Sequence, residues 1–342
     1  MVTPFERLTA AGRRRRFHAL AAAALADYDL RDASVRFHAD DTNLLYRVTT
    51  HGGERFMLRM GSPEWRTLTD LESEAMWLDA LARDTAVGAP QMLRARNGRQ
   101  VLVRDIPGSA MSAHVMVMTW VDGRLLGGAL VQRNLEEMGR LFAVLHEHGK
   151  AWVPPPGFTP RRFDDWLSRG EPDLLAGAAP TGAPASGAPP LGVPTEAWAL
   201  LGRMRQHVER AYAALDLADL RVIHCDLWHD NIKVDRGALR PIDFEDTTNG
   251  FRIHDIAMAM LDLLEATDEA TYATLYAAFR RGYRSLLEWP DAPIEPFQVG
   301  RLLWKINWVA RHEPEWLAQT VERHVPVLAG YEATGRLAKP PV

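Results

Sequence analysis

The chain has 342 residues, of which 47% are hydrophobic and 25% charged, and its formal net charge is -4. This length is too great for one ordinary core and predicts two lobes, and the charge excludes the globally basic surface of a nucleic-acid-binding protein. The sequence lacks an apolar run of about 18 residues, which excludes a membrane-spanning helix. The single cysteine, Cys225, excludes an intramolecular disulfide and predicts a reducing compartment. Together with the charge and the missing apolar run, it predicts a cytoplasmic protein that binds neither nucleic acid nor membrane.

The first 60 residues predict a helix followed by a hairpin. Residues 1–30 contain an alanine-rich stretch of high helix propensity. The segments NLLYRVTT and RFMLRM are joined by a turn at Gly52-Gly53, which predicts two antiparallel strands.

The next 60 residues predict one helix within more strands. Residues 67–84 have the periodicity of an amphipathic helix, whose apolar face holds Leu71, Ala75, Leu78 and Leu81. Residues 91–103 predict a second hairpin that turns at Asn97-Gly98, and residues 114–121 predict a buried strand.

The remainder of the chain is predicted to be mainly helical. The helical segments are 134–149, 196–215 and 253–337, and short strand-like segments are 221–226, 231–235 and 239–244. Residues 172–194 are rich in proline, alanine and glycine, which predicts a mobile surface loop.

The strongest chemical signal lies in residues 222–255. It contains His224, Asp226 and Asn231 in the spacing H-x-D-L-x-x-x-N, and a strand that ends at Asp243. The first three residues alone could arise by chance. The aspartate twelve positions after Asn231 and the Asp-Ile-Ala helix start at Asp255 make chance a poor explanation. The segment resembles the protein kinase signature set, and more closely the aminoglycoside phosphotransferase and choline kinase family.

This resemblance implies an α+β, bilobal protein-kinase-like fold. An antiparallel sheet lobe with leading helices would occupy residues 1–119, and a mainly helical catalytic and substrate lobe residues 120–342. The function implied is transfer of the γ-phosphate of ATP to a hydroxyl of a small molecule, with Mg²⁺ as the metal. The acceptor would be an aminoglycoside, an amino-alcohol or a hydroxy amino acid.

The spacing suits phosphoryl transfer. Such a reaction needs a carboxylate beside the acceptor hydroxyl, which the resemblance assigns to Asp226 as catalytic base. Asn231 and Asp243 supply the hard oxygen ligands that a magnesium ion prefers. His224 and Asp255 are assigned the support of the catalytic loop, and Asp255 is expected to cap the helix that it starts.

The resemblance also assigns nucleotide-binding residues in the first lobe. Arg59, in a predicted strand, and Glu74, on the following helix, would form the phosphate-binding pair. Backbone groups around Met118 and Trp120 would contact adenine. The glycine-rich phosphate loop is absent, so Thr42 and Asn43 are the candidates to cover the phosphates.

Two departures limit the type of kinase. Arg59 stands where many kinases have lysine, and its guanidinium has a different geometry from a compact ammonium. Only about a dozen residues separate Asp243 from Asp255, which leaves no room for a long phosphorylatable activation segment. Cys225 stands where regulated protein kinases have arginine, and we interpret it as a small buried residue.

Three alternatives stay open at this point. The chain could be a catalytically silent kinase-like binding module, or a serine/threonine protein kinase of the stress-response type. It could also be a metal-dependent hydrolase, with His224, Asp226, His229 and Asp243 as ligands.

No motif in residues 253–342 identifies the acceptor. A cluster of aromatic and acidic residues there would suit a cationic or sugar-like ligand, but would equally suit a core and a surface: Trp304, Trp308, Glu315 and Trp316. Glu245 and Asp246 follow the metal-binding aspartate and are expected to face the acceptor.

Overall fold

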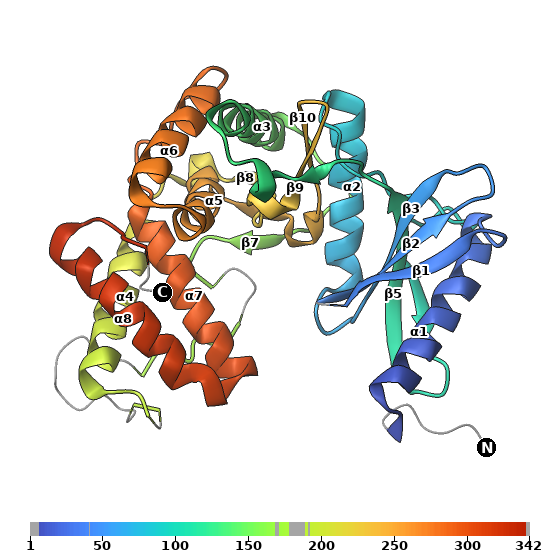
Figure 1. Ribbon diagram of the computed structural model, residues 1–342, viewed down its shortest axis with the longest axis horizontal. Coiled ribbons are helices and arrows are strands. Elements are labelled where there is room, and N and C mark those ends of the chain that lie inside the picture. The colour runs from blue at the N-terminus through green and yellow to red at the C-terminus, as the bar shows by residue number, and fades with distance from the viewer. Residues whose placement is uncertain (1–6, 41, 168–170, 178–188, 191, 340–342) are drawn as a thin grey trace. The chain divides into compact units, whose positions relative to one another are not determined.

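The computed structural model describes residues 7–40, 42–167, 171–177, 189, 190 and 192–339 (Figure 1). The chain divides into two compact units. The N-terminal unit comprises Met1–Gly123, Val153–Pro160 and Arg240–Glu245, and the C-terminal unit comprises Arg124–Trp152, Arg161–Leu239 and Asp246–Val342. The predicted α+β fold, with a strand-rich first part and a mainly helical second part, is confirmed.

The N-terminal unit is built on a five-stranded antiparallel sheet of order β1-β2-β3-β5-β4. Its strands are β1 (Ser34–Asp40), β2 (Asn43–Thr49), β3 (Arg55–Gly61), β4 (Leu102–Asp105) and β5 (Ser112–Thr119). Two helices cover its two faces, α1 (Ala10–Ala24) and α2 (Leu68–Asp84) (Figure 1). Alternate residues of β3 face opposite sides, so Leu58 and Met60 pack in the core that α1 completes.

Helix α2 has the strongest local start signal in this unit. Thr67 is its N-cap, and the side chains of Thr67 and Asp70 form a capping box with each other's backbone N–H groups. The four predicted apolar positions of α2 are all buried: Leu71, Ala75, Leu78 and Leu81. Capping and periodicity agree here, which explains why the sequence predicted this helix well.

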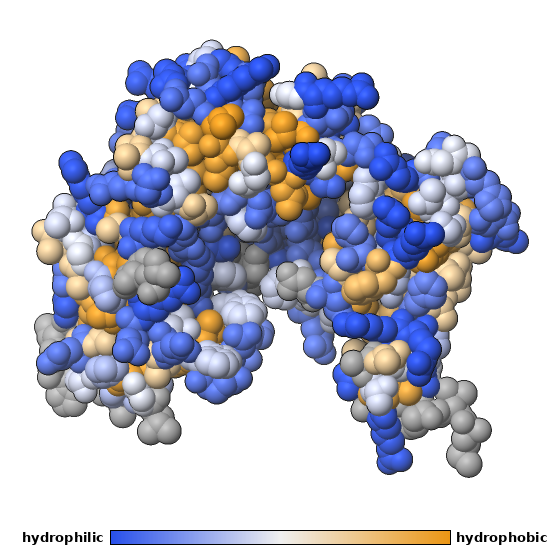
Figure 2. Space-filling view, viewed as in Figure 1, coloured by the Kyte–Doolittle hydropathy of each residue, from blue (hydrophilic) through white to orange (hydrophobic). Residues whose placement is uncertain are grey.

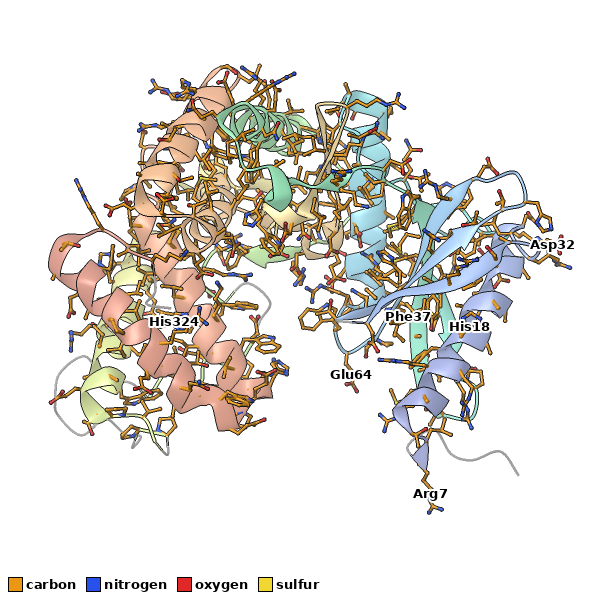
Figure 3. All side chains as sticks on the ribbon, viewed as in Figure 1. Arg7, His18, Asp32, Phe37, Glu64 and His324 are labelled. Carbon is orange, nitrogen blue, oxygen red and sulfur yellow. The ribbon has the colours of Figure 1, made fainter. Side chains whose placement is uncertain are left out.

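One sequence prediction in this unit needs correction, and one strand was missed. The turn at Asn97-Gly98 is present, with Gly98 in the left-handed region at φ 81°, but residues 91–101 form no strand beyond a single bridge from Met92 to Met118. Strand β1 was not predicted, because its side chains are mostly exposed and it lies at the edge of the sheet, without the apolar alternation of a half-buried strand. Phe37, on β1, is labelled in Figure 3.

The C-terminal unit is mainly helical, as predicted. Its helices are α3 (Gln132–Ala151), α4 (Thr195–Ala213), α5 (Arg252–Ala266), α6 (Glu269–Arg284), α7 (Glu295–His312) and α8 (Leu317–Thr334). Helix α3 crosses α6 and the strand β8 (Arg221–Ile223) very closely. A Cβ at Gly139 would lie 2.0 Å from the carbonyl oxygen of Phe279, and one at Gly149 would lie 2.0 Å from that of Val222. Only glycine allows these approaches, and the second fixes the strand that leads into the predicted catalytic loop, residues 224–231.

Two small sheets support that loop. One has the order β7-β11-β8, from β7 (Arg161–Phe163), β11 (Thr248–Gly250) and β8 (Arg221–Ile223). The other has the order β10-β9-β6, from β10 (Ala238–Pro241), β9 (Ile232–Asp235) and β6 (Arg124–Leu125). The turn between β9 and β10 has Arg236 and Gly237 at positive φ, as a tight hairpin requires. The sequence did not predict β6, β7 and β11, which have two or three residues each.

Much of the predicted loop at 172–194 lies outside the described residues, which cover 171–177, 189, 190 and 192 onward. None of the described helices is long and apolar enough to cross a membrane. The face drawn in Figure 2 is mostly hydrophilic, with separate smaller hydrophobic areas.

Candidate active site

Arg59 and Glu74 form a buried ion pair in the N-terminal unit. Arg59 lies on the face of β3 opposite Leu58 and Met60, which directs it toward α2 and Glu74. Its Nη2 donates a hydrogen bond to Glu74 Oε2, and its Nε and Nη2 contact Met116 Sδ at 3.2 and 3.0 Å. Only 3% of Arg59 and 1% of Glu74 is exposed. Arg59 on β3 and Glu74 on α2 therefore point toward each other, and the sequence had paired them only through the family resemblance.

The electrostatics of this pair are governed by burial and by neighbouring carboxylates. Burial opposes the charge on Arg59, but Glu74, Glu245 and Asp243 together raise its pKa above the ordinary value. Burial raises the pKa of Glu74, and the guanidinium of Arg59 acts in the opposite direction. Arg59 thus remains a fixed positive charge, and Glu74 depends on it for its own ionisation.

Asp243 follows β10 and lies near the same arginine. Its Oδ1 is 3.9 Å from Arg59 Nη1, and its side chain is 46% exposed. Its backbone has φ 64°, a conformation that non-glycine residues adopt rarely. Strained positions of this kind are common at functional sites, where the surrounding fold maintains them.

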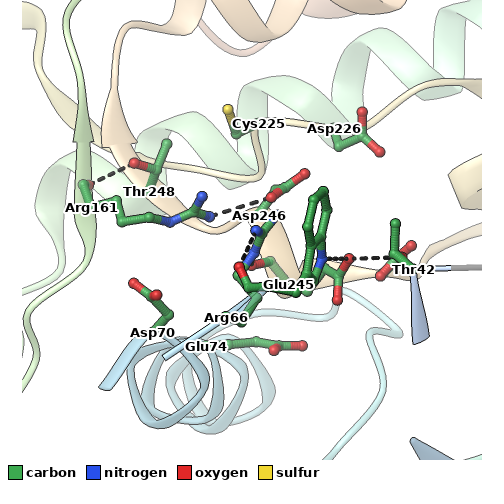
Figure 4. Close-up of polar contacts among 12 residues, drawn as sticks. Thr42, Arg66, Asp70, Glu74, Arg161, Cys225, Asp226, Glu245, Asp246 and Thr248 are labelled. Atoms are coloured by element: carbon green, nitrogen blue, oxygen red, sulfur yellow. Dashed lines mark hydrogen bonds and ion pairs between the residues drawn. The ribbon is translucent and has the colours of Figure 1, made fainter. Parts of the chain in front are cut away.

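Glu245 holds the turn between β1 and β2. Its carboxylate accepts hydrogen bonds from Asn43 Nδ2, from Thr42 Oγ1 at 3.4 Å and from Trp65 Nε1 at 3.1 Å, while Arg66 Nε donates to its carbonyl oxygen at 3.1 Å (Figure 4). Glu245 therefore contacts the two side chains that were predicted to cover phosphates. A phosphate that took these donors would replace the Glu245 carboxylate.

The predicted hinge follows β5. Met118 lies opposite Met57 in the sheet, and the N–H of Trp120 donates to the carbonyl oxygen of Arg55 at 3.2 Å. The Trp120 side chain contacts His38 edge-on, with the ring centroids 5.5 Å apart. Because this N–H is already used within the sheet, an adenine contact at Trp120 would have to use its carbonyl oxygen.

The catalytic loop of the C-terminal unit is anchored at Cys225. This residue has φ 67°, and its backbone N–H donates to Asp255 Oδ1 at 2.7 Å. Asp255 was expected to cap helix α5, which is wrong: the N-cap is Phe251, and Asp255 lies buried in the first turn. Its carboxylate thus acts on the loop backbone 30 residues earlier and not on its own helix.

Two further side chains fix Asp255 in place. His146 Nε2 lies 3.1 Å from Asp255 Oδ2, and Tyr283 Oη lies 3.0 Å from His146 Nδ1. Burial lowers the pKa of His146 and raises the pKa of Tyr283 to about 12, so both are neutral at pH 7. Burial would raise the pKa of Asp255, but its hydrogen bond with His146 and the nearby imidazoles lower it overall. The neutral Tyr283 therefore donates a hydrogen bond to the neutral His146, which in turn donates one to the ionised Asp255.

Asn231 orients Asp226 within this loop. The Asn231 Nδ2 donates to the carbonyl oxygen of Asp226 at 2.8 Å and to its Oδ2 at 3.1 Å. Because the amide nitrogen is turned toward Asp226, the amide oxygen is the atom that a cation would contact. His224, two residues before Asp226, is fully buried, as a residue that supports the loop would be.

Arg301 is a functional candidate that the sequence analysis missed. It lies on α7, and its Nη2 is 3.4 Å from Asp226 Oδ1. Its Cζ lies 4.2 Å from the ring centroid of Trp304. The only available signal was an arginine and a tryptophan three residues apart in a predicted helix, and nothing in the chain order connected them with Asp226.

The tryptophans considered as a substrate pocket do line one cavity. It has a volume of about 970 Å³, and its lining includes Trp304, Trp308 and Trp316. His324 of α8, labelled in Figure 3, also lines it. Glu315 is exposed and is not among the lining residues, and the carboxylate that does line the cavity belongs to Glu322.

Asp246, which was expected to face the acceptor, forms an ion pair within the protein. Asp246 Oδ1 lies 3.3 Å from Arg161 Nη2, and the carbonyl oxygen of Arg161 accepts a hydrogen bond from Thr248 Oγ1 (Figure 4). Among the described residues, no three histidine, cysteine, aspartate or glutamate side chains are grouped as a metal site would require. The geometry therefore gives no support to the hydrolase hypothesis.

Replacement of His254 should reduce the acid sensitivity of the fold. Burial lowers the pKa of this histidine to about 3, and Tyr212 Oη lies 2.7 Å from its Nδ1. Between pH 6.5 and 3 the unfolded chain binds a proton that the folded chain does not, so stability is lost as the pH falls. We expect His254 to account for about 2 kcal/mol of the unfolding free energy lost between pH 6.5 and 5.

Chemical denaturation at these two pH values measures this loss for the wild type and for His254→Gln, which retains an acceptor for Tyr212. His312→Gln makes the same change at an exposed position and should behave as the wild type does. An equal pH dependence in all three proteins would contradict the prediction.

The family model described as "APH: Phosphotransferase enzyme family" matches residues 33–289. A search of curated protein sequences found no significant match. The solved structures that the chain resembles include a microcompartment-associated aminopropanol kinase, at 25% identity and TM-score 0.74, which covers 93% of this chain and 98% of that one.

Two other solved structures have lower identity and show the fold alone. An amicoumacin kinase is 17% identical, with a TM-score of 0.72 and coverage of 93% of this chain and 96% of that one. A choline/ethanolamine kinase family protein from Mesorhizobium loti is 20% identical, with a TM-score of 0.57 and coverage of 92% and 94%. The family match spans well over half of the sequence and includes every predicted catalytic and metal-binding residue. The chain therefore belongs to the phosphotransferase enzyme family, has its protein-kinase-like fold, and is a phosphotransferase of the small-molecule kinase type.

Proposed function

We propose that the protein transfers the γ-phosphoryl group of ATP to a hydroxyl of a small molecule in the cytoplasm, with Mg²⁺ as the metal and Asp226 as the base. The observation that carries this proposal is the hydrogen bonding of the catalytic loop. Asn231 holds both the carbonyl and the carboxylate of Asp226, and Asp255 holds the backbone of Cys225. A base held in this way is preorganised to receive a proton from a bound hydroxyl.

In the proposed reaction the acceptor hydroxyl oxygen forms a bond to the γ-phosphorus. The bond from that phosphorus to the β–γ bridging oxygen breaks, ADP leaves, and the hydroxyl proton passes to Asp226. The side chain of Asp226 is 24% exposed, so a substrate can reach it.

Asn231 and Asp243 are the residues that we propose as ligands of the magnesium ion, and each offers an oxygen atom of the kind that this ion prefers. Asp243 offers a half-exposed carboxylate, and the amide of Asn231 is oriented by its bonds to Asp226. Both are hard oxygen donors, and Mg²⁺ commonly binds proteins through one or two carboxylates together with nucleotide phosphates. When bound, the ion would neutralise charge that develops on those phosphates.

The remaining nucleotide contacts are proposed for residues of the N-terminal unit. Arg59, held by Glu74, is proposed to pair with phosphate oxygens. Thr42 and Asn43 are proposed to donate to phosphates in place of Glu245. The amicoumacin kinase was solved with AMP-PNP and Ca²⁺, which supports a nucleotide and a divalent cation as ligands here.

Nucleotide binding can be tested without knowledge of the acceptor. Addition of ATP and Mg²⁺ together should stabilise the protein, by about 2.7 kcal/mol at a ligand concentration 100 times the Kd. ATP without the metal should stabilise it less. Thermal unfolding measures both, and no stabilisation by Mg²⁺-ATP would support a silent kinase-like module instead.

The acceptor can then be sought by an ADP-release screen over hydroxylated metabolites and aminoglycosides. The Asp226→Asn protein serves as the blank, because it should bind the nucleotide without turnover.

A further inference from the structure

Arg301 places a largely buried positive charge beside the proposed base. The 3.4 Å from its Nη2 to Asp226 Oδ1 is longer than the roughly 2.7–2.9 Å of a strong charge-assisted hydrogen bond. Its Nε is buried and has no hydrogen-bond partner within the described part of the chain. A buried donor without an acceptor is unfavourable. The guanidinium therefore has hydrogen-bonding capacity that the protein itself does not satisfy.

The guanidinium of Arg301 lies over the ring of Trp304. The indole ring lies 4.2 Å from Arg301 Cζ, and its Nε1 donates to Glu171 Oε1 at 2.8 Å. A guanidinium stacked on an anchored ring has lost little further freedom when it binds a planar anion. The Trp304 ring also lines the 970 Å³ cavity, but Arg301 itself is not one of its lining residues.

The charged residues that line this cavity are Lys305, Arg323 and Glu322, so the cations outnumber the carboxylate and disfavour a cationic ligand. Arg301 covers one face of Trp304, and that face is therefore not open to an ammonium group. Lys305, one turn later on α7, adds a second cation, although Glu265 at 3.0 Å neutralises it. In the proposed reaction Asp226 gains a proton and loses its negative charge. The positive charge of Arg301 is then no longer balanced by Asp226, and a second anion beside it would be favourable.

We propose that Arg301 binds a carboxylate of the phosphoryl acceptor. The acceptor is accordingly a hydroxy acid, such as a hydroxy amino acid, and not a polycationic amino sugar. The inference rests on the proposed function, with Asp226 as base. The short distance between Arg301 and Asp226 suits a molecule whose carboxylate and hydroxyl are a few bonds apart, and the guanidinium fork matches carboxylate geometry.

Matched pairs of acceptors test this inference directly. L-threonine and 1-aminopropan-2-ol differ only by a carboxylate, as do L-homoserine and 3-aminopropan-1-ol. The wild type should bind and phosphorylate the carboxylated member of a pair better. Arg301→Gln should lower kcat/KM for that member by roughly 10- to 150-fold, the effect of losing a hydrogen bond to a charged group, and mainly through KM. The decarboxylated member should change little.

Arg311→Gln is the matched control, because it removes the same charge from an exposed position of the same helix. Calorimetric titration of each pair onto the enzyme with Mg²⁺ and AMP-PNP gives a readout that does not need turnover. Three results would overturn the inference: a wild-type preference for the decarboxylated member, no binding by either pair, or an equal fall in kcat for both members in Arg301→Gln. The last would make Arg301 a positioning residue for Asp226. Failure of the proposed function would appear separately, as no stabilisation by Mg²⁺-ATP.

Discussion

Substitution of Asp226 by asparagine is expected to lower kcat by about 10²- to 10⁴-fold, the usual contribution of a general base. The amide cannot accept the hydroxyl proton, but it keeps the size and planarity of the carboxylate. Asn231 can still donate to its oxygen and to the backbone carbonyl of residue 226. The Kd for Mg²⁺-ATP should therefore remain close to that of the wild type. Single-turnover ADP release and nucleotide titration measure the two quantities separately.

Asp230→Asn is the matched control for this prediction. It makes the same change in the same loop, and we expect nearly wild-type turnover from it. Wild-type turnover by Asp226→Asn would remove the assigned base. A large loss of nucleotide affinity in that variant, with little loss of turnover, would instead place Asp226 among the nucleotide or metal ligands.

Replacement of Glu74 by glutamine is expected to destabilise the N-terminal unit by roughly 3–5 kcal/mol. Arg59 is almost fully buried, and Glu74 is the carboxylate in direct contact with it. Loss of that partner leaves a desolvated positive charge whose nearest other carboxylate oxygen, Asp243 Oδ1, is 3.9 Å away. The guanidinium should also lose its fixed position, so Mg²⁺-ATP should bind more weakly. Chemical denaturation and nucleotide titration check the two effects.

Glu64→Gln provides the comparison, because Glu64 is an exposed glutamate of the same unit, labelled in Figure 3. A double variant, Arg59→Met with Glu74→Leu, separates stability from function. It should regain much of the lost stability, since apolar groups of similar volume can replace a buried ion pair. Its affinity for Mg²⁺-ATP should stay low. Full nucleotide affinity in the double variant would show that Arg59 has no part in binding phosphate.

The sequence was informative wherever a structural or chemical signal is local. The catalytic loop is predictable because Asp226 and Asn231 lie five residues apart, so a short loop is enough to join them. Helix α2 is predictable because Thr67, Asp70 and the apolar face all belong to one short segment. The strand β1 was missed for the converse reason, since its exposed edge position leaves no pattern in the side chains.

What the sequence by itself determined is the kinase motif set, the division into a strand-rich and a helical part, and the pairing of Arg59 with Glu74 by resemblance. Only the tertiary structure decided that residues 240–245 and 153–160 pack with the N-terminal unit, and that Asp255 holds the loop at Cys225. It alone brought Arg301 to Asp226, 75 residues away in the chain. The physical reason is that such contacts depend on how whole helices and strands pack, and side-chain burial and close glycine crossings set that packing without leaving a motif of fixed spacing.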